Sequence, residues 1–168
     1  EDVEAFDSFE LNALAKARVY RRHTGSEVIA DDSGLCVDAL RGAPGVRSRR
    51  FAADHGMDRP DQDEANNDCL LHLLDEVREE ERGAHYRCAI ACVDSERTLV
   101  VAGRVHGQIT RERRGSGGFG YDPLFLPTSY EETFGELPAE VKARISHRAE
   151  AIRSLRKWLE PIGTEEVS

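Results

Sequence analysis

Two adjacent carboxylates, Asp31 and Asp32, follow the short apolar stretch 27–30, whose composition predicts a buried strand. The acids would then lie at the carboxyl end of that strand, where open α/β sheets place their ligand crevices, and Gly34 would permit a sharp exit. Two carboxylates about 4 Å apart repel by roughly 4 kcal/mol at an effective dielectric of about 20, so we expect a cation or a lysine beside them. The alternative is that one Asp forms an Asx turn and the other faces water.

Basic side chains that could bind phosphate occur in two places. Lys16 falls inside an apolar helical stripe with Ala13 and Ala17, so its ammonium must find an anion or extend along the helix to solvent. The segment 47–50, Arg-Ser-Arg-Arg, is a basic group in an acidic chain, which suggests phosphate contact or, alternatively, a solvated surface run.

The stretch 115–123, Gly-Ser-Gly-Gly-Phe-Gly-Tyr-Asp-Pro, is too rich in glycine for a helix or strand, so we predict a loop. Its glycines would bring backbone amides close to a ligand. Phe119 offers a flat face for a base, and Asp122 could accept a hydrogen bond from a ring N–H. The loop lacks the features of a Walker motif or of a dinucleotide fingerprint, and an ordinary flexible connection is the alternative.

A polar triplet, Ser146-His147-Arg148, stands near an expected helix start and is preceded by Lys142. These side chains could surround a ligand with hydrogen-bonding groups. Alternatively, Ser146 is a plain N-cap and the others are surface charges.

The elements that must position these residues follow from hydrophobic periodicity. The expected helices cover 9–23, with Phe9, Ala13, Ala17 and Tyr20 on one stripe, then 63–81, and finally a segment from 138–140 to about 159, with Ile152, Leu155 and Leu159 on its core face. The expected extended segments are 27–30, 35–40, and a hairpin of 86–93 and 98–110 that turns at 94–97. This order predicts an α/β or α+β domain whose segments form two lobes around a cleft.

Composition narrows the class of protein. The length of 168 residues predicts one domain, 1–168. No apolar run approaches the roughly 20 residues of a membrane span, and the amino end is acidic, unlike a secretory signal, so we expect a cytoplasmic location. A net charge of -9 repels nucleic acid polymers and anionic membranes, so we expect neither as a partner. The four cysteines show no pairing pattern and are expected to be reduced and mostly buried.

Five sequence blocks, taken together, resemble those of the non-canonical purine nucleoside triphosphate pyrophosphatases. In order, the blocks are Asn12-Ala13 with Lys16-Ala17, 30–35, 43–46, 116–123 and 146–148. The resemblance extends from about Glu4 to Leu159, and the agreement of the blocks in order favours the functional interpretation of each one.

The resemblance implies an elongated, two-lobed α/β fold in which helices flank a mixed β-sheet and a central cleft takes the substrate. It also implies a homodimer and a Mg²⁺-dependent hydrolysis of inosine, deoxyinosine and xanthosine triphosphates (ITP, dITP, XTP) to the monophosphate and pyrophosphate, which removes them from the nucleotide pool. The alternatives are a nucleotide-binding module without turnover and a pyrophosphatase acting on other modified nucleotides.

The resemblance also assigns roles by position. Asp32 resembles the catalytic carboxylate, and the metal site would comprise Glu4, Asp31 and Asp32. Lys16 resembles a phosphate contact and Phe119 the residue that stacks on the purine. The full set of implied substrate-binding residues is Lys16, Ser33, Gly34, Ser116, Gly117, Gly118, Phe119, Gly120, Tyr121, Asp122, Lys142, Ser146, His147 and Arg148.

Selectivity for these bases has a chemical reason. Hypoxanthine and xanthine carry a 6-oxo acceptor where adenine has an amino donor, so donors such as Arg148 and His147 would be left unpaired by ATP. Sites built around such hydrogen bonds discriminate by about 10⁴ or more. Guanine shares the 6-oxo group, so its rejection must depend on the 2-position.

One part of the family pattern is missing. The family begins with a strand followed by a Ser/Thr-x-Asn-x-x-Lys loop that grips the triphosphate, and this motif does not occur here. Without that strand a sheet edge would be unpaired. We therefore expect the sequence to be incomplete at its amino end.

Overall fold

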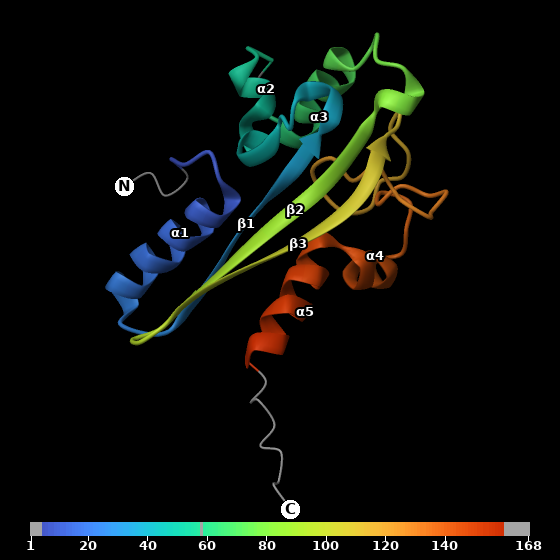
Figure 1. Cartoon of the computed structure of the whole chain (residues 1–168). Helices are drawn as coiled ribbons and strands as arrows, with labels where there is room; N and C mark the ends of the chain where they lie inside the picture. Colours follow the sequence, from blue (N-terminus) through green and yellow to red (C-terminus); the bar gives the residue numbers. More distant parts are fainter. Residues whose placement is uncertain (1–4, 58, 160–168) are drawn as a thin grey trace, which may run out of the picture.

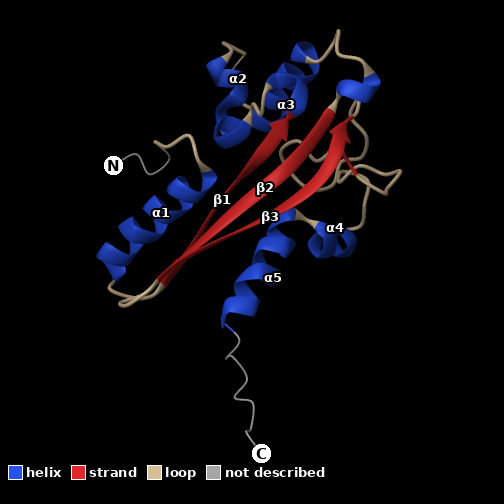
Figure 2. Ribbon diagram, viewed as in Figure 1, coloured by secondary structure: helices blue, strands red, loops and turns tan. Residues whose placement is uncertain are grey.

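The computed structural model describes residues 5–57 and 59–159, which form one antiparallel sheet flanked by helices (Figures 1 and 2). The strand order is β1-β2-β3-β4, with β1 Val28–Val37, β2 Gly83–Val93, β3 Thr98–Ile109 and β4 Phe125–Pro127. The helices are α1 Phe9–Thr24, α2 Phe51–Asp54, α3 Gln62–Leu73, α4 Ala139–Ile145 and α5 His147–Leu159, with short 3-10 turns η1 Asp38–Leu40, η2 Gly45–Arg50 and η3 Glu79–Glu81. The α/β class is confirmed; the described strand pairs are all antiparallel, whereas the resemblance implied a mixed sheet.

Strand β2 explains why helices lie on both faces of the sheet. Side chains alternate along a strand, and here both faces are apolar. Ala89, Ala91 and Val93 pack with α1, whereas Cys88 and Ile90 pack with α5. The sheet is therefore sandwiched between α1 and α5 at one end (Figure 1).

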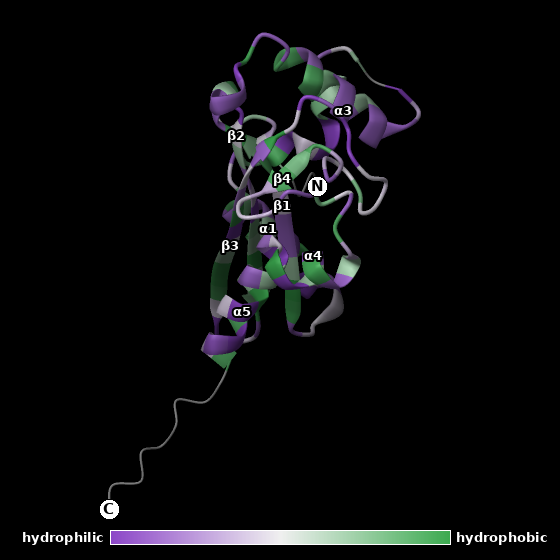
Figure 3. Ribbon diagram, turned by 90° about the vertical axis from the view of Figure 1, so that its right-hand side faces the viewer, coloured by the Kyte–Doolittle hydropathy of each residue, from purple (hydrophilic) through white to green (hydrophobic). Residues whose placement is uncertain are grey.

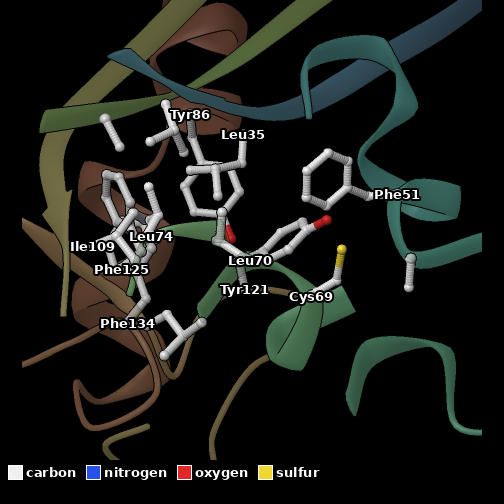
Figure 4. Close-up of a cluster of buried hydrophobic side chains, with 14 of the residues drawn as sticks. Leu35, Phe51, Cys69, Leu70, Leu74, Tyr86, Ile109, Tyr121, Phe125 and Phe134 are labelled. Atoms are coloured by element: carbon white, nitrogen blue, oxygen red, sulfur yellow. The ribbon is translucent and has the colours of Figure 1, made fainter. Parts of the chain in front are cut away.

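A larger core occupies the other end of the sheet, where α2, α3 and β4 gather (Figure 4). Leu35 and Tyr86 of the sheet meet Leu70 of α3 and the rings of Phe125 and Phe134 there. The long strands run through both ends, which gives the elongated shape with two lobes (Figure 1). In Figure 3 hydrophilic and hydrophobic residues mix along each helix, and none of the helices in the described ranges is long and apolar enough to cross a membrane.

The first helix is confirmed with a one-residue difference in its end. Ser8 caps it through a hydrogen bond from Leu11 N–H to Oγ, and Gly25 ends it in the left-handed conformation, with φ 69°. The predicted apolar stripe is wrong at Tyr20, which is 58% exposed. The buried positions of the helix end at Ala17, so Tyr20 lies beyond the part that packs on the sheet.

The expected break between two extended segments is wrong. Strand β1 is continuous from Val28 to Val37 and passes through Asp31 and Asp32 without a turn. Their neighbours in β2 are Ile90 and Ala89, so the antiparallel ladder holds the acids in extended conformation and overrides their preference for turns. The acids therefore lie in the middle of a strand.

The predicted helix 63–81 is also wrong in its second half, because α3 ends at Leu73. The buried guanidinium of Arg82 donates to the carbonyls of Leu74, Val77, Ile109 and Thr110 at 2.6–3.4 Å. In a continuing helix the carbonyls of Leu74 and Val77 would accept from backbone N–H groups, whereas here they accept from the Arg82 side chain. Burial lowers the pKa of Arg82.

The last helical segment is confirmed in extent but is divided at Ser146 into α4 and α5. Leu155 is buried as predicted, whereas Ile152 and Leu159 are 49% and 55% exposed, which corrects the expected core face. The hairpin β2–β3 and the loop nature of 115–123 are confirmed, and all four cysteines are free and buried. Strand β4 was not predicted because three residues give no periodicity.

We predict that Arg82→Met lowers the free energy of unfolding by roughly 3 kcal/mol, because it leaves several buried carbonyls without donors. The matched control is Arg78→Met, whose exposed ion pairs with Glu80 and Glu81 should contribute little to stability. Urea unfolding of the three proteins measures both values, and equal losses would contradict the structural role of Arg82.

Candidate functional site

A cavity of about 790 Å³ lies between the two lobes of the chain. Its walls are the middle of β1, η2, the start of α3, the loop 115–123, and the α4–α5 corner. Ser33 and Gly34 of β1 face Phe119, Lys142 and Arg148 across one hollow. The strand that contains the two acids and the glycine-rich loop therefore line the same cavity.

Gly115, Gly118 and Gly120 of this loop have positive φ, and two of them lie beside Phe119. Gly118 has φ 76°, and a Cβ there would lie 2.0 Å from Asp122 Oδ2. Gly120 has φ 60°. These are left-handed conformations that residues with side chains rarely adopt. The absence of a side chain at Gly118 leaves room for the Asp122 carboxylate, which accepts a hydrogen bond from Phe119 N–H at 2.8 Å.

Phe119 stands in the cavity with 62% of its surface exposed. The Lys142 ammonium lies 4.6 Å and the Arg148 guanidinium 5.7 Å from its ring centroid. Lys142 also forms an ion pair with the buried carboxylate of Asp122. An exposed aromatic face bordered by cations suits a planar ligand that carries hydrogen-bond acceptors.

His147 is buried and stacks on Tyr86, with ring centroids 4.8 Å apart and an interplanar angle of 10°. Burial, with smaller contributions from the charges of Arg148 and Lys142, lowers the pKa of His147 to about 3. The imidazole is therefore neutral near pH 7, and its Nδ1 has no hydrogen-bond partner within the described part of the chain. Ser146 accepts from Ala149 N–H, so it caps α5 and also lines the cavity.

The two acids leave β1 on opposite faces, because side chains alternate along a strand. Asp32 is buried toward α1, where Lys16 Nζ donates to Oδ1 at 2.7 Å and Asn12 Nδ2 donates to Oδ2 at 3.2 Å. Asp31 lies on the other face, where Arg148 Nε and Ser33 Oγ each donate to Oδ2 at 3.1 Å. The expected positive partner is present for each acid, and their separation onto two faces removes the close repulsion that we expected.

A second, open hollow of about 530 Å³ runs along the outer edge of β1 beside α1. Lys16 and Asp31 line it. Asp32 lines neither hollow, but its chain neighbours Asp31 and Ser33 line one each. The ion pair of Asp31 with Arg148 therefore connects the border of the second hollow to the wall of the first.

Most of the predicted substrate-binding residues come together in the larger cavity. They are Ser33, Gly34, Gly117, Gly118, Phe119, Gly120, Tyr121, Asp122, Lys142, Ser146, His147 and Arg148. Ser116 is exposed outside the cavity lining, and Lys16 belongs to the second hollow. Glu4, the third predicted metal ligand, lies outside the described residues.

Several residues at the site were given no specific role from the sequence. Asn12 is buried and binds Phe6 N–H and C=O as well as Asp32, so it fixes the acid relative to the segment before α1. Asp63 lines the cavity from α3, four residues before Asn67. This helical spacing of polar residues was the available signal. In the basic segment 47–50, Arg47 forms an exposed ion pair with Asp54, whereas Arg49 lines the cavity.

Comparisons with known proteins identify a family and several similar chains. The family model described as the Ham1 family matches residues 1–158. A dITP/XTP pyrophosphatase from Bacillus licheniformis is 46% identical over 161 residues, covering 95% of this chain and 80% of that protein. One from Streptomyces coelicolor is 46% identical over 149 residues, covering 88% and 72%.

Solved structures are similar over the same span. The Ham1 protein of Staphylococcus aureus superposes with a TM-score of 0.85 at 39% identity, covering 94% of this chain and 79% of that chain. A nucleoside-triphosphatase, described as a dITP/XTP pyrophosphatase, from Mycobacterium abscessus gives 0.78 at 44% identity, covering 93% and 78%.

We predict that His147 makes the stability of the fold depend on pH. The unfolded chain binds a proton there near pH 6.5 and the folded chain only near pH 3, so stability falls as pH falls through this window. The slope from this residue is at most about 1.4 kcal/mol per pH unit. His147→Gln should reduce the loss of unfolding free energy between pH 7.5 and pH 5, as urea unfolding measures. If the variant and the wild type lose the same free energy of unfolding between pH 7.5 and pH 5, His147 has the same pKa in the folded and unfolded chains and the prediction is wrong.

Proposed function

The chain belongs to the Ham1 family, and we propose that it hydrolyses the non-canonical purine nucleoside triphosphates ITP, dITP and XTP to the nucleoside monophosphate and pyrophosphate. The names of the similar proteins support the substrate class. The observation that carries the proposal is the cavity that runs from β1, beside Asp32, to the exposed ring of Phe119.

The larger cavity suits the purine base. Phe119 would stack on the base, while Lys142 and Arg148 present donors 4.6 Å and 5.7 Å from its ring centroid. A 6-oxo group accepts hydrogen bonds from such donors, whereas the 6-amino group of adenine would leave them unpaired. Neutral His147 contributes one ring nitrogen as donor and one as acceptor.

The second hollow suits the triphosphate. Lys16 supplies positive charge there and is already paired with the Asp32 carboxylate. A nucleotide with its base at Phe119 would pass the border marked by Asp31 and Arg148 and extend its phosphates toward Lys16. This arrangement would bring the bond between the α and β phosphates close to Asp32.

We further propose that the reaction depends on Mg²⁺. Among the residues described, no group of three or more His, Cys, Asp or Glu could hold a metal ion. Mg²⁺ is commonly held by one or two carboxylates together with water and substrate phosphates. Because Asp31 and Asp32 leave β1 on opposite faces, one carboxylate of the pair would hold the ion together with water and the phosphates. When bound, the ion would neutralise phosphate charge.

The chain's own residues supply the remaining chemistry. Asn12 and Lys16 hold both oxygens of Asp32, which orients the carboxylate. An ionised Asp32 can accept a proton from the attacking water. The positive charge of Lys16 would also stabilise the negative charge of the phosphates during hydrolysis.

Three further expectations, one from the resemblance and two from length and composition, stay predictions. These are the homodimer, the cytoplasmic location, and a single domain over 1–168. Two alternatives remain distinct from the main proposal. A binding module without turnover would release no pyrophosphate, and an enzyme for other modified nucleotides would release it from a different substrate.

A panel of triphosphates scored for pyrophosphate release tests the proposed function. We expect fast release from ITP, dITP and XTP with Mg²⁺, slow release from ATP and dTTP, and loss of activity with EDTA. Tight binding of ITP without release would support the binding module instead. Faster release from dTTP than from ITP would support an enzyme for other nucleotides.

We predict that Asp32→Asn reduces kcat at least 100-fold and keeps substrate affinity within a few-fold, because it removes a proton acceptor and preserves the shape. Asp38→Asn, at an exposed acid just beyond the end of β1, is the matched control and should keep the wild-type rate. Steady-state kinetics with ITP measure both, and a normal kcat for the Asp32 variant would assign the role to another group.

Arg148→Ala should lower the ratio of kcat/KM for ITP to that for ATP by at least tenfold, because a donor that pairs with the 6-oxo group is removed. Its effect on the Mg²⁺ concentration needed for half-maximal rate should be smaller. The same kinetics at several Mg²⁺ concentrations separate the two effects. A preserved ratio with altered metal dependence would place Arg148 at the phosphates.

A further inference from the structure

Two side chains of α3 hold the backbone of a single residue, Gly120, in the loop 115–123. Asp63 Oδ2 accepts from Gly120 N–H at 2.7 Å, and Asn67 Nδ2 donates to Gly120 C=O at 2.9 Å. Residues four apart on a helix lie on the same face, one turn above the other. The spacing of Asp63 and Asn67 thus matches the N–H and the C=O of one glycine, and both of its backbone groups are occupied.

This contact fixes the residue that precedes Gly120. Phe119 is held on its own N–H by Asp122 at 2.8 Å, and the next residue is held by α3. Tyr121 is fixed in turn, since its hydroxyl donates to Ser48 C=O at 2.8 Å. The backbone around Phe119 is therefore restrained by its own loop, by α3 and by η2, whereas its ring is 62% exposed in the cavity.

We propose that Asp63 and Asn67 are positioning residues that fix the ring of Phe119 for stacking on the purine base. The inference rests on the proposed function and adds to it a specificity device outside the predicted site residues. A binding group held in place before the ligand arrives gives higher affinity, because less conformational freedom is lost on binding. The pair should therefore set affinity for the base and leave the affinity for phosphates unchanged.

The two residues differ in what they tolerate. Asp63 acts as an acceptor, and asparagine at this position keeps an acceptor oxygen while it removes the charge. Asn67 acts as a donor inside the protein, where it is 2% exposed, and its Oδ1 has no partner among the described residues. Aspartate at position 67 would place a carboxylate oxygen against the carbonyl of Gly120. Asp63→Asn should thus be tolerated and Asn67→Asp should not.

Calorimetric titration with inosine and, separately, with inorganic tripolyphosphate tests this without turnover. We expect Asp63→Ala to weaken inosine binding about tenfold, the loss typical of one charge-assisted hydrogen bond, with unchanged tripolyphosphate binding. Asp63→Asn should stay within about twofold to threefold of the wild type, and Asn67→Asp should lose tenfold or more. Glu64→Ala removes another acid from the first turn of α3 and is the matched control, expected to bind both ligands normally.

Amide hydrogen exchange provides a readout that needs no ligand. The Gly120 amide should exchange at least tenfold faster in Asp63→Ala and at the wild-type rate in Glu64→Ala. Unchanged exchange at Gly120, or equal losses of inosine affinity in both variants of Asp63, would overturn the positioning role. An unsubstituted chain that fails to bind inosine would contradict the proposed function, while the exchange experiment would still test the contact itself.

Discussion

The alternation of side chains along β1 is the constraint on which the rest of the site depends. Because the strand continues through Asp31 and Asp32, one acid is buried toward α1 and the other projects toward α5. Each acid then meets a different cation, Lys16 or Arg148. A turn at this point, as the composition suggested, would have placed both acids on one edge with a single shared environment.

This separation divides the chemistry between two hollows that share one strand. The base would be recognised where Phe119, Lys142 and Arg148 meet, and the phosphates would be held along the outer edge of β1 near Lys16. An ion pair between Asp31 and Arg148 lies between the two hollows. Arg148, which would recognise the base, and Asp31, which borders the hollow proposed for the phosphates, therefore restrain each other. The surrounding fold supports this arrangement, since α1 and α5 pack on opposite faces of the sheet.

Local patterns predicted α1, the hairpin and the glycine-rich loop, because periodicity and glycine content act over a few residues. The resemblance supplied most residues that line the cavity, although Lys16 and Ser116 lie outside it. The predictions that were wrong depended on contacts between residues distant in sequence. Pairing with β2 keeps β1 extended at Asp31 and Asp32, and the buried Arg82 donates hydrogen bonds to carbonyls that follow Leu73. The hold of Asp63 on Gly120 links residues 57 positions apart, and no local pattern contains it.

The central claim is that one nucleotide occupies both hollows, with its base and its phosphates on opposite sides of the border at Asp31 and Arg148. A crystal structure of the Asp32→Asn variant with ITP and Mg²⁺ tests this most directly. The account predicts a purine ring stacked on Phe119 and phosphate oxygens within hydrogen-bond distance of Lys16. Phosphates enclosed with the base in the larger cavity, away from Lys16, would contradict it.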